Sequence, residues 1–146
     1  MRLTDVAATE ALGAALATVV RVGDVVTLSG PLGAGKTSLA RGLLGALGLA
    51  GDAPSPTFAI VQPYAPPETR FPVLHVDLYR IERAAEIEEL GLDDARRDAL
   101  LVIEWPERAG AHWGDALALT LSPTPDGART LTAQVPPAWE GRWPPQ

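Results

Sequence analysis

The chain has 146 residues with 18 acidic and 12 basic side chains, so its formal net charge at pH 7 is −6. This length suits one domain with one ordinary core, and a hydrophobic fraction of 47% argues against a disordered chain. The acidic balance excludes a uniformly basic surface for gripping nucleic acid, and the absence of cysteine excludes disulfides and thiolate sites. No apolar run reaches the roughly 18 residues of a membrane span, so a soluble cytoplasmic protein is expected.

The amino-terminal third is predicted to place a glycine-rich loop between a strand and a helix. Apolar spacing and turn residues predict, in chain order, a helix over 3–20, a strand over 25–29, a loop over 30–35 and a helix over 36–47. Thr4 or Asp5 can cap the first helix, because either side chain can accept hydrogen bonds from free backbone N–H groups. The strand is short and apolar, which is typical of a strand buried on both faces.

The remainder of the chain continues the alternation of strands and helices. The pattern predicts strands over 58–61, 73–77 and 100–104, a polar helix over 83–90 that can continue over 93–99, and strands over 117–121 and 130–135. Residues 124–127, Thr-Pro-Asp-Gly, predict a hairpin between the last two strands. This alternation favours an α/β sandwich in which one domain spans 1–136 and an irregular Pro/Trp-containing tail spans 137–146.

The glycine-rich loop carries the strongest functional motif. Residues 30–37 read Gly-Pro-Leu-Gly-Ala-Gly-Lys-Thr and fit the phosphate-loop pattern G-x-x-x-x-G-K-[ST]. Its glycines let backbone N–H groups converge on a polyphosphate, at the positive end of the helix that follows. Lys36 is the single lysine beside 11 arginines and would place a compact charge between the β- and γ-phosphates. Thr37 would offer a hydroxyl to Mg²⁺, and Ser38 a further donor. A simple glycine-rich turn with an exposed lysine is the alternative.

Two predicted strands end in carboxylates, Asp77 and Glu104. Ligands of open α/β sheets bind at the carboxyl ends of the strands, so both acids reach the loop if their strands flank the first one. Either acid could hold Mg²⁺ directly or through water while the other orients the attacking water. A solvated strand end is the alternative for each acid.

Other polar residues carry weaker signals. His75 and His112 are far apart in the sequence, so a core or hydrogen-bonded role is favoured over metal ligation for both. Arg80 pairs either with nearby acids or with charge near the γ-phosphate, and the sequence leaves both open. The acidic segment 82–89 is most simply a solvated surface, with a basic partner as the alternative.

Four motifs, taken in their order and spacing, resemble the TsaE family of small bacterial ATPases, which serve threonylcarbamoyladenosine modification of tRNA. They are the phosphate loop 30–38 with Ala40-Arg41-Gly42 behind it, Ser55-Pro56-Thr57-Phe58, His75-Val76-Asp77-Leu78-Tyr79-Arg80 and Ile103-Glu104-Trp105-Pro106. The resemblance runs over nearly the whole chain, from about residue 3 to about residue 135. It implies a P-loop NTPase-like three-layer α/β sandwich with a mainly parallel sheet and an antiparallel carboxy-terminal hairpin.

The resemblance also implies a site for ATP or ADP with Mg²⁺. Lys36, Asp77 and Glu104 would be catalytic, and Thr37, Glu104 and Asp77 would surround the metal. The nucleotide would contact Val6, Gly33, Ala34, Gly35, Lys36, Thr37, Ser38, Thr57, Trp105 and Arg129. Among these, Val6 and Arg129 would flank the base and ribose, Thr57 would sense the γ-phosphate in a switch segment, and Trp105 would report the nucleotide state.

The family's activity suggests partners as well as chemistry. The resemblance implies a slow Mg²⁺-dependent ATPase that works with the TsaD and TsaB proteins on the adenosine beside the anticodon. Such a protein would meet tRNA only through the complex, without DNA or membrane partners. Two alternatives stay open: a P-loop small-molecule kinase with Arg96 and Arg97 on its lid, and a non-catalytic ATP-gated adaptor.

Overall fold

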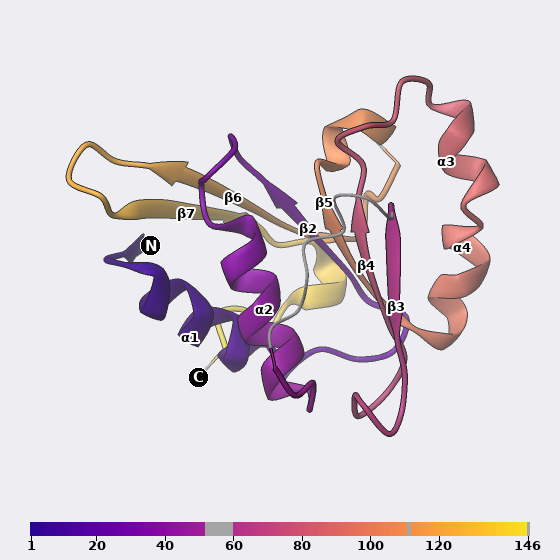
Figure 1. Cartoon of the computed structure of the whole chain (residues 1–146), viewed down its shortest axis with the longest axis horizontal. Coiled ribbons are helices and arrows are strands. Elements are labelled where there is room, and N and C mark those ends of the chain that lie inside the picture. The colour runs from indigo at the N-terminus through magenta and orange to yellow at the C-terminus, as the bar shows by residue number, and fades with distance from the viewer. Residues whose placement is uncertain (52–59, 111, 146) are drawn as a thin grey trace.

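The computed structural model describes residues 1–51, 60–110 and 112–145, and these form a single sheet with helices on both faces (Figure 1). The seven strands of this described part are Arg2–Leu3 (β1), Val25–Ser29 (β2), Val61–Tyr64 (β3), Val73–Asp77 (β4), Leu100–Glu104 (β5), Leu117–Pro123 (β6) and Arg129–Gln134 (β7). Their order across the sheet is β1-β7-β6-β2-β5-β4-β3. The four central strands, β6, β2, β5 and β4, are parallel, whereas β1, β7 and β3 pair antiparallel at the edges.

The helices complete the three layers expected from the family resemblance. They are Val6–Leu16 (α1), Lys36–Ala46 (α2), Ala85–Glu89 (α3) and Leu92–Ala95 (α4), with 3₁₀ turns at Arg96–Asp98 (η1), Pro106–Ala109 (η2) and Pro137–Trp139 (η3). α1 and α2 cover one face of the sheet, and α3 and α4 cover the other face over β4 and β5 (Figure 1). The predicted α/β sandwich with a mainly parallel sheet and a terminal hairpin is therefore confirmed.

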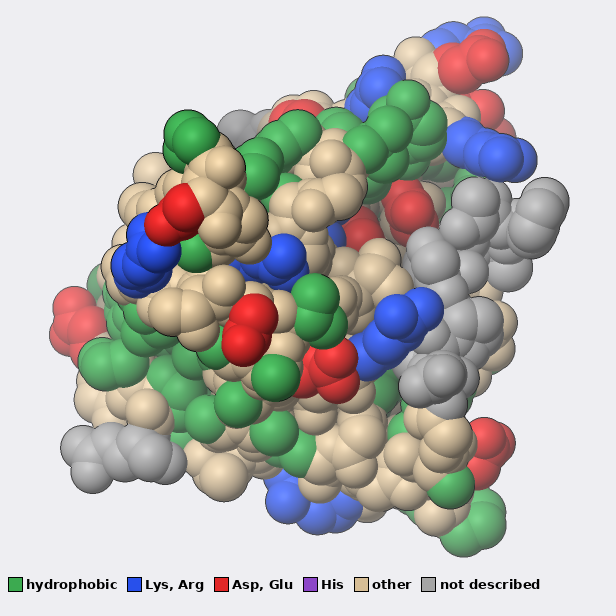
Figure 2. All heavy atoms as spheres, turned by 60° about the vertical axis from the view of Figure 1, so that its left-hand side comes forward, with side chains coloured by type: hydrophobic (Ala, Val, Ile, Leu, Met, Phe, Trp, Pro, Cys, Tyr) green, Lys and Arg blue, Asp and Glu red, His purple; other side chains and the backbone are tan. Residues whose placement is uncertain are grey.

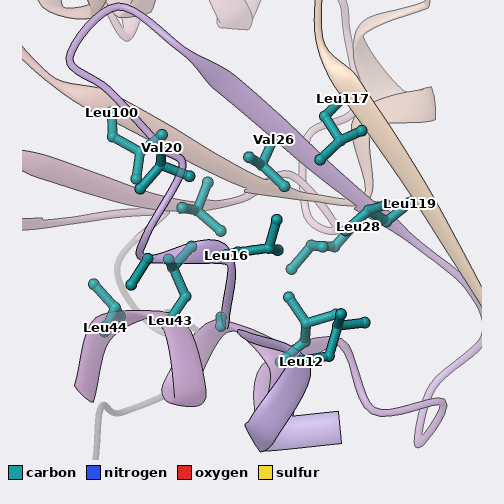
Figure 3. Close-up of a cluster of buried hydrophobic side chains, with 14 of the residues drawn as sticks. Leu12, Leu16, Val20, Val26, Leu28, Leu43, Leu44, Leu100, Leu117 and Leu119 are labelled. Carbon is teal, nitrogen blue, oxygen red and sulfur yellow. The ribbon is translucent and has the colours of Figure 1, made fainter. Parts of the chain in front are cut away.

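The larger core lies between the sheet and the α1–α2 pair. Alternate residues of the central strands, such as Val26 and Leu28 of β2, point towards Leu16 of α1 and Leu43 of α2 (Figure 3). Intervening residues of β2, β4 and β5 pack with α3 and α4 on the opposite face, among them Val25, Val76 and Leu101. This burial on both faces explains why β2, β4 and β5 are predominantly apolar in sequence.

The first helix is shorter than the predicted 3–20. Arg2 and Leu3 form strand β1 against β7, and the Asp5 carboxylate accepts a hydrogen bond of 2.8 Å from the Ala8 backbone N–H. Of the two predicted caps, Asp5 is thus the one used, and α1 begins at Val6. The helix ends at Leu16 and turns follow, so the prediction was too long at both ends.

The larger remaining differences lie at the third strand and the polar helix, whereas the ends of α2, β6 and β7 differ from the prediction by at most two residues. β3 occupies Val61–Tyr64 rather than the predicted 58–61, whose first two residues lie outside the described part. The predicted helix 83–90 with its continuation is broken into α3, α4 and η1. Gly91, which adopts a left-handed φ of 66°, separates the first two. No helix within the described residues has the length and apolarity that crossing a membrane requires.

Candidate functional site

The glycine-rich loop, residues 30–35, connects the carboxyl end of β2 with the amino end of α2. Gly30 has a φ of 141°, and a Cβ at this position would lie 2.3 Å from the Leu121 carbonyl oxygen. Gly35 has a φ of 105° and directly precedes Lys36, so no side chain at this position caps α2. The N–H groups of the first turn of α2 are therefore left to an external acceptor, as in anion-binding loops.

A pocket of about 370 Å³ opens at this loop. Its lining includes these residues predicted from the sequence: Val6, Gly33, Ala34, Gly35, Lys36, Thr37, Ser38, Asp77, Glu104, Trp105 and Arg129. Leu32, Tyr79 and Arg80 also line it, and Leu32 carries no signal in the sequence that would have predicted this. Thr57 and the rest of the motif 55–58 lie outside the described residues.

Lys36 is buried against the loop that precedes it. Its side chain is 5% exposed, and its ammonium donates to the carbonyl oxygens of Gly30 and, at 3.2 Å, Pro31. The same ammonium lies 3.8 Å from the centre of the Trp105 ring. Burial lowers the pKa of Lys36, and the negative charge of Glu104 opposes that shift. The arrangement holds one cation at the mouth of the phosphate loop.

Glu104 lies at the end of β5, directly beside β2. Its side chain is 3% exposed, and its Oε1 atom accepts a hydrogen bond of 3.3 Å from the Thr37 hydroxyl at the start of α2. Its second oxygen, Oε2, lies 2.7 Å from Nε2 of His75. This contact confirms the hydrogen-bonded role predicted for His75. The sequence did not reveal Glu104 as its partner.

Asp77 ends β4 and lies directly opposite Glu104 in the parallel register. The sheet order corrects one condition of the prediction, because β5 flanks β2 whereas β4 lies one strand further out. Burial raises the pKa of Asp77, and the nearby negative charge of Glu104 raises it further. The Oδ1 atom of Asp77 accepts a hydrogen bond of 2.9 Å from the Tyr79 backbone N–H, which fixes the turn after β4.

The opposite side of the pocket is formed by the first helix and the terminal hairpin. Val6, the first residue of α1, is 48% exposed at the pocket. Arg129 of β7 reaches the loop so closely that a Cβ on Gly35 would lie 2.6 Å from its Nη1 atom. Nη1 also donates a hydrogen bond of 3.4 Å to the Thr9 hydroxyl of α1. The apolar side chain of Val6 and the guanidinium of Arg129 thus border the site on the side away from Asp77 and Glu104.

The oxygen atoms around Thr37 fit Mg²⁺ only in combination with a phosphate. No three His, Cys, Asp or Glu side chains group closely enough within the described residues to hold a metal ion by themselves. The hydroxyl of Thr37 and the carboxylate of Glu104 are hard oxygen donors, and Mg²⁺ commonly binds one or two carboxylates together with phosphate oxygens. Burial raises the pKa of Asp77 first and the charge of Glu104 adds to it, and a cation bound beside both carboxylates would favour their charged forms.

The candidate lid of a kinase is not at this site. Arg96 and Arg97 belong to η1, which precedes β5 and therefore lies at the amino ends of the parallel strands. Arg96 donates to the Gly23 carbonyl oxygen at 2.8 Å and pairs with Asp115. The phosphate loop lies at the opposite, carboxyl ends of the same strands, so these arginines do not form a lid over it.

Comparisons with known proteins agree with this geometry. Residues 3–131 match the family described as threonylcarbamoyl adenosine biosynthesis protein TsaE. The curated protein of that name from Streptomyces coelicolor is 46% identical over 97 residues, which are 66% of each chain. The Mycobacterium leprae protein is 40% identical over 117 residues, 75% of this chain and 70% of that one.

The fold has a solved counterpart as well. The crystal structure of Bacillus subtilis YdiB superimposes with a TM-score of 0.76 and 27% sequence identity, covering 91% of this chain and 82% of that one. The matches to curated relatives span about two thirds of those proteins, between 60% and 70% of their length. Because the family match extends over most of the sheet and the entire phosphate loop, the chain belongs to the TsaE family of threonylcarbamoyl adenosine biosynthesis proteins.

Proposed function

We propose that the chain is the ATP-binding and ATP-hydrolysing component of the machinery that makes threonylcarbamoyladenosine in tRNA. The observation that carries this proposal is the grouping of Lys36, Thr37 and Glu104 at the phosphate loop of a TsaE family member. The relatives are named for tRNA threonylcarbamoyladenosine biosynthesis, and the site supports a nucleotide as the ligand.

The nucleotide would bind with its phosphates against the loop and its base towards Val6 and Arg129. The backbone N–H groups at the start of α2 would donate to phosphate oxygens. Lys36 would exchange its bonds to the loop carbonyls for bonds to the β- and γ-phosphates. Ser38 and the predicted switch residue Thr57 would supply further polar contacts.

Hydrolysis would depend on the acids at the ends of β4 and β5. Thr37 and Glu104 would hold Mg²⁺, with Asp77 beside them, and bound Mg²⁺ would neutralise charge that develops on the phosphates. Asp77 would orient the attacking water and accept its proton, because a raised pKa makes a carboxylate a better proton acceptor. Lys36 would stabilise the same developing charge from the loop side.

The surface favours a protein partner over direct binding to tRNA. Lys and Arg side chains are scattered among Asp and Glu on the face shown in Figure 2 rather than gathered into a basic patch, and the net charge is −6. Phosphate backbones are bound through clustered cations. With the family resemblance, which implies TsaD and TsaB as partners, we infer that tRNA is met through their complex and that the chain acts in the cytoplasm.

The test measures phosphate release from Mg·ATP by the purified chain, alone and with TsaD and TsaB. Lys36→Ala should abolish tight nucleotide binding, because the variant loses the ammonium that is held against the loop carbonyls and would meet the phosphates. Glu104→Gln should reduce hydrolysis by about 100-fold or more while nucleotide binding persists, as expected when a charged transition-state contact is removed.

Arg97→Ala is the matched control, because this arginine is 80% exposed at the opposite edge of the sheet. It should release phosphate at the wild-type rate. ATP bound without any phosphate release, with or without the partners, would instead identify a non-catalytic adaptor. Undiminished turnover in Lys36→Ala would show that the site is elsewhere.

A further inference from the structure

We propose that His75 is a positioning residue that fixes the Glu104 carboxylate for Mg²⁺ and water. This inference rests on the proposed function, in which Glu104 serves the metal. It concerns a side chain outside the pocket lining that reaches the nucleotide only through Glu104.

β4 and β5 bring His75 and Glu104 together inside the protein. His75 pairs with Val102 and Asp77 pairs with Glu104 in the parallel register, so His75 and Glu104 are diagonal neighbours on the α1–α2 face of the sheet. Their side chains are 0% and 3% exposed, and Nε2 lies 2.7 Å from Oε2. A contact this short and this buried restricts the rotation of the carboxylate.

The surroundings of the imidazole show which of its two ring nitrogens donates a hydrogen bond. The other ring nitrogen, Nδ1, is buried with no hydrogen-bond partner among the described residues. A proton on Nδ1 would be a buried donor without an acceptor, which is costly, whereas a bare Nδ1 leaves only an unused lone pair. Because a carboxylate oxygen only accepts, the contact between Nε2 and Oε2 has Nε2–H as its donor and Glu104 as its acceptor.

The donation gives the two oxygens of Glu104 separate tasks. Oε2 is committed to His75, so Oε1 is turned towards the Thr37 hydroxyl at the site proposed for Mg²⁺. Without His75 the carboxylate would rotate among several orientations, and part of the metal affinity would be lost in ordering it. In metal sites generally, a second residue that hydrogen-bonds to a metal ligand holds that ligand in the orientation the metal needs.

Two variants of matched length separate this role from packing. His75→Gln places an amide N–H where Nε2–H stands, whereas His75→Met fills a similar volume without a donor. We expect His75→Met to lower kcat for ATP hydrolysis by about 10- to 100-fold, and His75→Gln to recover most of that loss. Binding of ADP is then titrated by calorimetry in EDTA and in Mg²⁺. Affinity in EDTA should be equal in all three proteins, whereas the gain on adding Mg²⁺ should shrink about 10-fold in His75→Met only.

Equal behaviour of the Gln and Met variants in the Mg²⁺-dependent step, whether both match the wild type or both fall, would overturn the inference. A loss of ADP affinity in EDTA by the Met variant would also overturn it, because that would indicate damage to the loop rather than to the carboxylate. The proposed function fails separately, if wild-type protein releases no phosphate. The comparison of ADP binding with and without Mg²⁺ still tests His75 in that case.

Discussion

The backbone of Trp105 adopts a left-handed conformation that is unusual for a residue with a large side chain. Its φ is 61°, and within the described residues no other residue except glycine has a positive φ. Such a conformation costs an L-residue about 1–2 kcal/mol, so surrounding contacts must hold it. The indole ring lies 3.8 Å from the Lys36 ammonium and 4.8 Å from the Tyr79 ring, measured to the ring centres. Its position is thereby tied to the cation that we expect to meet the phosphates.

We predict that Trp105 is the source of any change in tryptophan fluorescence when nucleotide binds. Movement of the Lys36 ammonium towards a phosphate would alter the electric field at the Trp105 indole. Trp105→Phe should therefore abolish most of the fluorescence change. Trp143→Phe, in the tail, should preserve it. Calorimetry should find nucleotide affinity in Trp105→Phe within about fivefold of wild type, as expected for one cation–π contact. Survival of the full signal in that variant would place the reporter at another tryptophan.

At the scale of elements, the backbones of α1 and α2 pack closely against each other where each helix has a glycine. A Cβ on Gly13 would lie 2.1 Å from the Leu39 carbonyl oxygen, and one on Gly42 would lie 2.0 Å from that of Glu10. Neither backbone oxygen can move aside without displacing a helix. Because α2 begins at the phosphate loop, this contact also determines where Lys36 stands relative to the sheet.

Two alanine substitutions in α2 test this contact. Gly42→Ala should lower the free energy of unfolding by about 1–3 kcal/mol, because the methyl group overpacks the helix crossing. Gly45→Ala, with nothing within 4 Å of its added Cβ, should raise it by about 0.5–1 kcal/mol through helix propensity. Urea unfolding monitored by circular dichroism measures both. Equal effects of the two substitutions would mean that the helices can part without loss.

The sequence predicted the elements that their own residues define. β2, β4 and β5 were predicted with their observed bounds, because unbroken apolar runs mark strands buried on both faces. β1 was missed because two residues, Arg2 and Leu3, become a strand only by pairing with β7. The site followed the same division. The loop motif predicted Lys36 and Thr37 as site residues. The contact between His75 and Glu104, by contrast, depends on a strand register that no local sequence pattern encodes.

At the scale of the whole molecule, the carboxy-terminal tail packs onto the domain. Trp139 is 1% exposed within the α1–α2 core, and the tail, predicted to be irregular, has only the 3₁₀ turn η3 among its described residues. Arg142 donates to both carboxylate oxygens of Asp24, at 2.7 and 3.0 Å, and to the Val19 carbonyl oxygen at 2.9 Å. Its guanidinium also lies 4.0 Å from the centre of the Trp139 ring. The tail thereby joins the turn after α1 to the start of β2.

We predict that this packing stabilises the fold without serving the site. Trp139→Ala should lower the free energy of unfolding by about 3–5 kcal/mol, the usual loss for a buried aromatic side chain. Glu140→Ala, at an exposed neighbouring position, should change it by less than about 0.5 kcal/mol. Chemical denaturation gives both values, and ADP titration of the folded protein should find equal affinity. An unchanged stability in Trp139→Ala would contradict the packing described for the tail.

The position of β2 at the centre of the sheet also bears on how the molecule folds during synthesis. Its neighbours are β5 and β6, which follow some 75 and 90 residues later in the chain. β2 and the loop after it therefore emerge from the ribosome long before either neighbour exists, and contacts so distant in sequence form slowly. The amino terminus waits longer still, since the Met1 carbonyl oxygen accepts from the Leu131 N–H at 2.8 Å. We therefore expect a ribosome-bound chain to bind nucleotide tightly only after β6 has been made, because the phosphate loop follows a strand whose two neighbours are β5 and β6.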